Sequence, residues 1–144
     1  MNAEAIAAML DEDRREWALL CEALDAHPEG ALHDPESPEW TARDVYAHLE
    51  RWINHSTGDL ERVLAGGGIT PIDGDDDTIN ARWQAEDSSL TLDEARAKAE
   101  RTFERRIAAI ESVAADRWNP ALAAIAHADD ATHYRAHRSW IRAS

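Results

Sequence analysis

Apolar residues recur every three or four positions along four long stretches of this 144-residue sequence. This spacing places them on one face of an α-helix, and no stretch shows the alternation of a half-buried strand. The four stretches cover about residues 2–26, 41–65, 91–115 and 120–140. We therefore expect an all-α fold, in which residues 1–144 form one four-helix bundle domain.

Helix-start signals support three of these stretches. Thr41 with Asp44, and Thr91 with Glu94, have the spacing of a capping box. Pro120 suits the first turn of the last helix, which we expect to continue to the C-terminal histidines. Glycines end the second helix, and a long loop follows it. Within that loop, residues 77–87 are expected to form a short helical segment.

Charge and cysteine content limit the classes of partner. The formal net charge is −14, which disfavours attraction to nucleic acid or to an anionic membrane surface. No apolar run is long enough to span a membrane, and no signal segment is apparent. The single cysteine, Cys21, fits a reducing compartment. We expect a cytoplasmic protein with a small-molecule substrate, and the sequence leaves a homodimer open.

His133 and His137 lie four residues apart in the last predicted helix. Side chains at this spacing project from the same side of a helix, so both imidazoles can reach one ion. A structural alternative stays open, in which both rings hydrogen-bond to neighbours at the edge of a groove.

His48 favours the metal interpretation. It lies at the edge of the apolar face of the second helix, and bundles bring such faces together in the core. Three imidazoles and a water would give an open site for a divalent ion, with zinc or nickel as candidates. Buried without an ion, the three rings would need several other partners.

Further residues are candidates for supporting roles. His55 follows His48 by two helical turns and is a candidate proton carrier. Asp129 precedes His133 by one turn, where it either orients that ring or caps a helix start. Trp52, Trp83 and Trp140 are expected to wall an apolar ligand pocket. The acidic run at 73–77 lacks the glycine and glutamate of a calcium loop, so a solvated loop is expected.

Two short segments resemble the DinB-like superfamily. In "WTARDVYAHLERW" (40–52), a tryptophan precedes a helix start, and an aspartate is followed four residues later by a histidine. The tail "THYRAHRSWI" (132–141) resembles the closing helix of that superfamily, closest to its ClbS/DfsB-type subgroup. Residues 79–95 also resemble the corresponding region of that subgroup and of mycothiol-dependent maleylpyruvate isomerases.

The resemblance implies a four-helix bundle in which His48, His133 and His137 are metal ligands. Relatives include thiol-dependent transferases and isomerases and a hydrolase-like resistance protein. It therefore implies a metal-dependent thiol transferase or hydrolase, with a low-molecular-weight thiol such as mycothiol as cosubstrate. His55 and Tyr134 are the candidates for moving protons, and a small anionic or thiol ligand is expected at the metal. The alternative is a non-enzymatic bundle that binds a metal or a ligand.

Overall fold

The structure is a computed structural model that describes residues 1–35 and 37–141, and within these ranges it contains helices and no strand. The chain is therefore all-α, as predicted. No described helix is long and apolar enough to cross a membrane. The helices are α1 (Ala3–Asp25), α2 (Ala42–Leu64), α3 (Asp76–Glu86), α4 (Leu92–Glu111), a 3-10 turn η1 (Ala115–Arg117), α5 (Pro120–His127) and α6 (Ala131–Trp140).

The predicted helix starts are confirmed. The Asp44 carboxylate accepts a hydrogen bond from the Thr41 backbone N–H at 2.9 Å, and α2 begins directly after Thr41. At the start of α4, Thr91 and Glu94 exchange two hydrogen bonds of 3.1 Å. Pro120 occupies the first turn of α5. Each arrangement satisfies backbone N–H groups that a helix start leaves unpaired.

The last predicted helix is wrong in one respect, because it is two helices. α5 ends at His127 and α6 begins at Ala131. Asp130 caps α6 by accepting from the Thr132 N–H at 3.0 Å, and Asp13 of α1 accepts from the Ala131 N–H at 2.9 Å. These carboxylates provide partners for N–H groups that a continuous helix would use, so the chain restarts here.

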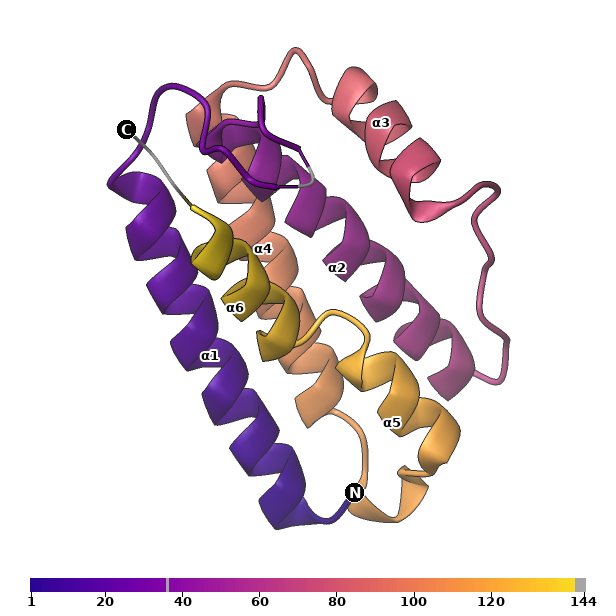
Figure 1. The fold of residues 1–144 in the computed structure, drawn as a ribbon. Helices are drawn as coiled ribbons and strands as arrows, with labels where there is room; N and C mark the ends of the chain where they lie inside the picture. The colour runs from indigo at the N-terminus through magenta and orange to yellow at the C-terminus, as the bar shows by residue number, and fades with distance from the viewer. Residues whose placement is uncertain (36, 142–144) are drawn as a thin grey trace.

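The long helices lie side by side, with the two short C-terminal helices between α1 and α2 (Figure 1). α2 packs mainly against α4, while α6 packs against α1 and α5 packs against α2. The core between them is apolar and almost inaccessible to solvent. Its most buried members include Leu20, Leu24, Leu49, Ile53, Phe103 and Ile110.

The connection from α2 to α4 contains α3, which confirms the short helical segment predicted near residues 77–87. Two side chains of α2 attach α3 to the rest of the molecule. Trp52 Nε1 donates to Asn80 Oδ1 at 2.7 Å, and the Arg51 guanidinium donates two hydrogen bonds to the Asp87 carboxylate, of 2.9 and 3.0 Å. A bidentate pair of this kind fixes orientation as well as distance. These contacts hold α3 beside α2 at Arg51 and Trp52, between His48 and His55 in the sequence.

A buried ion pair joins four helices. Arg106 of α4 donates through Nη2 to Asp13 of α1 at 2.8 Å, and to the carbonyl of Ala126 in α5 at 2.7 Å. Asp13 uses its other carboxylate oxygen for the Ala131 N–H at the start of α6. Both charged side chains are almost fully buried. The pair therefore fixes where α5 ends and where α6 begins.

We expect Arg106→Met to lower the free energy of unfolding by about 3–5 kcal/mol, because it leaves the buried Asp13 carboxylate without its counter-charge. Urea unfolding followed by circular dichroism measures the change. Arg101→Met is the control, since Arg101 is an exposed arginine on the same helix. Equal stabilities of the two variants would contradict the structural role of the pair.

Candidate metal centre

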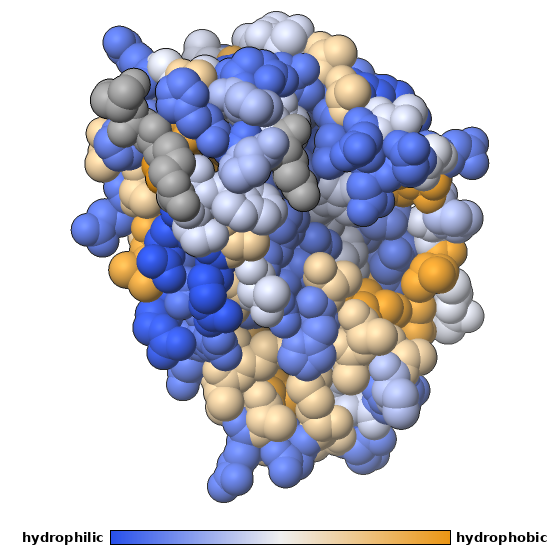
Figure 2. Space-filling model, viewed as in Figure 1, coloured by the Kyte–Doolittle hydropathy of each residue, from blue (hydrophilic) through white to orange (hydrophobic). Residues whose placement is uncertain are grey.

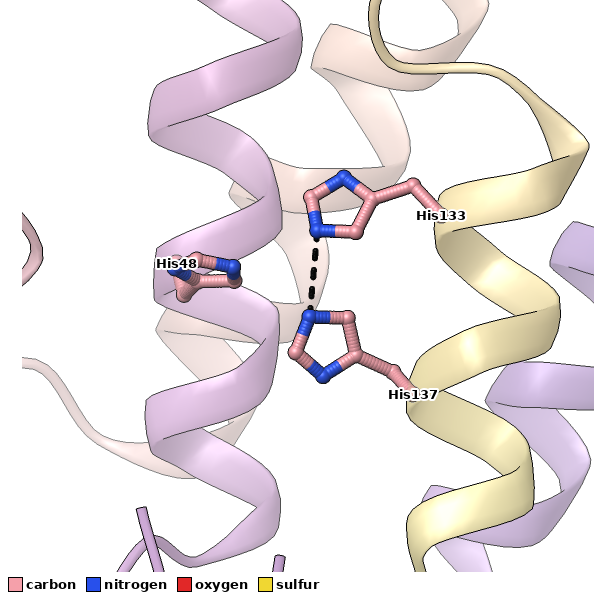
Figure 3. Close-up of side chains that lie close together, drawn as sticks. All are labelled: His48, His133 and His137. Atoms are coloured by element: carbon pink, nitrogen blue, oxygen red, sulfur yellow. Dashed lines mark hydrogen bonds between the residues drawn. The ribbon is translucent and has the colours of Figure 1, made fainter. Parts of the chain in front are cut away.

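The three histidines predicted from the sequence come together. His48 projects from α2, and His133 and His137 project from α6 toward it (Figure 3). One ring nitrogen from each lies within 4.8 Å of the other two. The Nε2 atoms of His133 and His137 are 3.1 Å apart. The expected convergence is therefore confirmed.

The chemistry of this donor set fits a divalent ion. Burial, reinforced by His137 and His133, lowers the pKa of His48 well below its usual value, so its ring is neutral at pH 7. Neutral imidazole is the form that binds metal. Among the described residues, the buried Nδ1 of His48 has no hydrogen-bond partner. Each neutral imidazole offers one ring nitrogen with a lone pair, and a cation between three such nitrogens would bind all of them.

Two buried carboxylates lie behind the α6 histidines. Asp129 Oδ1 is 3.3 Å from His133 Nδ1, and Asp34 Oδ2 is 3.6 Å from His137 Nδ1. Asp130 caps α6, so of the two predicted roles for Asp129 the structure shows the one beside His133. Carboxylates at Nδ1 favour a proton there and leave Nε2 free to face the centre. Sequence reasoning missed Asp34, since it lies in an irregular loop whose path the sequence does not indicate.

The histidines form part of the wall of a cavity of about 730 Å³. This volume lies in the range of small-molecule sites. His55, Trp52 and Trp140 line the same cavity, as predicted. Its other lining residues come from five regions of the chain: Asp34, Ser37, Trp40, Ser56, Asp59, Ile69, Asp76, Asp77, Asn80, Ala124, Ile125, Ala128 and Asp129.

The predicted tryptophans divide into two groups. Trp52 and Trp140 face the cavity, and the Trp140 ring centroid is 5.2 Å from that of His137. Trp83 does not line this cavity. It packs edge-on against Trp52 at 4.8 Å and lies under the Arg51 guanidinium, beside a smaller pocket. Trp40, which sequence analysis did not assign to the pocket, lines it with its ring 5.1 Å from His48.

His55 is held in place by Asp59. Its Nε2 lies 3.3 Å from Asp59 Oδ2, and both residues line the cavity. Asp59 in turn accepts from the Thr70 N–H at 2.8 Å and pairs with Arg62. This arrangement orients a titratable ring toward the cavity, although proton transfer by His55 stays a prediction.

The structure does not bring Tyr134 to the cavity. Its ring is fully buried against Trp17 and Phe103, and its hydroxyl donates to the Asp129 carbonyl at 2.6 Å. Burial also raises the pKa of this hydroxyl. The predicted role in moving protons is therefore not supported, and Tyr134 contributes to the core instead. Its position follows from α6 turning one face toward α1 and the opposite one toward α2.

Comparison of the chain with family models, with curated proteins and with solved structures found no match. The assignment of the site therefore depends on its own geometry and on the sequence resemblance.

Because the Tyr134 hydroxyl satisfies a buried carbonyl, we expect Tyr134→Phe to reduce the free energy of unfolding by about 1–3 kcal/mol. The folded variant should keep the metal content of the parent protein. Urea unfolding and elemental analysis measure the two quantities. A variant with unchanged stability would show that the hydroxyl does not have this role.

Proposed function

We propose that the chain binds one divalent metal ion, zinc or nickel, through His48, His133 and His137, and that it is a metal-dependent enzyme. The observation that carries the proposal is the group of three ring nitrogens within 4.8 Å of one another, on the wall of a cavity large enough for a substrate. The reaction class is a thiol-dependent transferase or a hydrolase of the detoxification type.

The number of ligands favours an enzyme over a non-enzymatic binding bundle. Structural zinc sites usually have four protein ligands, whereas catalytic ones keep a position for water or substrate. Within residues 1–35 and 37–141, no cysteine, aspartate or glutamate joins the three histidines in one ligand group. The remaining position would face the cavity.

A bound ion would supply either a water with a pKa near neutrality or a low-molecular-weight thiol, such as mycothiol, held as thiolate. The chain's own residues would do the rest. Trp52 and Trp140 would exclude water from the ligand, which strengthens electrostatic interactions inside the cavity. His55, oriented by Asp59, is the residue placed to accept or donate a proton.

The DinB-like interpretation supports the same proposal. It depends on the resemblance of residues 40–52 and 132–141, which contain all three histidines. In a DinB-like four-helix bundle, α1, α2 and α4 would be three of the helices. α5 and α6 together would take the place of the fourth.

The test is metal analysis of the purified protein and titration of the metal-free protein with zinc and nickel. We expect one equivalent per chain in the parent and none in His133→Ala, with the helical content unchanged because the core does not include the ion. His127→Ala is the matched control, since His127 is exposed and pairs with Asp130 outside the triad. Equal metal content in both variants would refute the site.

The two reaction classes are separated by titrating the cobalt-substituted protein with mycothiol, bacillithiol and glutathione. A sulfur-to-metal charge-transfer band would support the thiol transferase. If millimolar concentrations of the thiols leave the spectrum unchanged, the hydrolase is the better assignment.

Asp129→Asn should weaken metal binding by about 10–100-fold, because outer carboxylates orient histidine ligands and raise their basicity. Competition with a chromogenic chelator measures the affinity. Asp130→Asn is the control, because asparagine also caps helices and Asp130 lies beside His127 rather than His133. An affinity loss confined to Asp130→Asn would contradict the role given to Asp129.

A further inference from the structure

The lining of the large cavity carries charge of one sign. Five aspartates line it, and among the described residues that line it there is no lysine or arginine. The whole chain has a formal net charge of −14, so the net charge of the protein adds to this negative lining at long range. A cavity built to hold an anionic substrate usually presents a basic side chain to it.

Three of the five aspartates already have partners in the structure. Asp34 and Asp129 lie beside the histidines of the proposed metal centre. Asp59 is engaged by Arg62, by the Thr70 N–H and by His55. Their charges are therefore used to position other groups of the protein.

Asp76 and Asp77 are different. Both are exposed in the first turn of α3 and line the cavity, and neither forms an ion pair with another described residue within 4.0 Å. Asp75, and not either of these residues, caps the helix. Their carboxylates are thus the available charges on the part of the lining that α3 contributes.

Besides the aspartates, the histidines and three uncharged polar residues, the lining is apolar or aromatic. Ala124, Ile125 and Ala128 of the α5 region and the exposed Ile69 contribute aliphatic surface. Trp40, Trp52 and Trp140 contribute rings, whose faces attract cations as well as apolar groups. Figure 2 shows the same division on the surface, with hydrophobic colours over α5 and hydrophilic colours over α3.

We propose that the substrate of this cavity is an amphiphilic cation, with an apolar or aromatic body and a cationic amine. The body would lie against the tryptophans and the α5 wall, and the amine would face Asp76 and Asp77. This inference rests on the proposed function, because the reacting group of the substrate would lie at the three histidines. A cationic substrate departs from the small anionic ligand expected from the sequence, because no described lining residue is a lysine or an arginine.

The test uses three probes with the same phenylethyl body: (2-phenylethyl)trimethylammonium, 2-phenylethanol and 3-phenylpropionate. The quaternary cation cannot coordinate a metal, so its affinity reports the lining alone. Isothermal titration of the full chain, zinc-loaded and chelator-treated, measures each dissociation constant. We expect the cation to bind at least about 10-fold more tightly than the alcohol in both forms, with an advantage that shrinks as salt is added.

Asp76→Asn/Asp77→Asn should reduce the cation's advantage to about 3-fold or less. Asp93→Asn/Asp116→Asn is the matched control, because it removes the same net charge from exposed positions that do not line the cavity. Circular dichroism verifies that both variants fold. The proposal is overturned if the alcohol binds as tightly as the cation, or if the control loses the preference to the same extent.

The metal measurements stay separate from this result. If the cation is selected but zinc does not bind, the proposed metal function fails and the ligand class stands. If zinc binds and the cation is not selected, the metal function stands and the ligand class fails.

Discussion

The buried pair between Asp13 and Arg106 is the interaction on which the arrangement of the C-terminal half depends. A charge taken out of water is costly unless it is paired and hydrogen-bonded. Here Arg106 is shared between Asp13 and the Ala126 carbonyl, and Asp13 is shared between Arg106 and the Ala131 N–H. The Ala126 carbonyl in α5 and the Ala131 N–H at the start of α6 thus provide hydrogen-bond partners for a charge pair that α1 and α4 contribute. The core tolerates the pair because the break between α5 and α6 provides these backbone groups.

That break also determines how the histidines are presented. α6 begins at Ala131 and packs on α1, so Tyr134 enters the core while His133 and His137 face α2. Asp129 lies in the interruption itself, where it is free of helical constraints and lies beside His133. In an uninterrupted helix the same residue would project from a regular helical position one turn before His133. The charge pair in the core and the candidate metal centre are therefore connected through three residues of non-helical chain.

The sequence predicted what depends on local spacing and capping. Helix starts at Thr41, Thr91 and Pro120 follow from interactions within one turn, and the histidine pair follows from the i, i+4 geometry of α6. Including His48 required the further assumption that apolar faces meet, which holds here. The helix break was not predicted, because the partner of the Ala131 N–H is Asp13, 118 positions away. Asp34 and Trp40 were not assigned to the site for a related reason, since an irregular loop carries no periodicity that indicates which way it folds.

The distribution of charge around the cavity can be considered together with the proposed metal ligands. Three imidazoles are neutral donors, so a bound divalent ion would keep its full charge within the site. Asp34 and Asp129, both buried, lie close enough to the ring Nδ1 atoms to offset that charge from behind the histidines. The inner end of the cavity would then be close to neutral when the ion is bound. In that state the remaining charged groups of the lining would determine whether the cavity prefers a cationic or an anionic ligand. Among these, Asp76 and Asp77 have no ion-pair partner among the described residues. The two proposals therefore place metal binding and selection of the ligand's charge on different residues, the first on α2 and α6 and the second on α3.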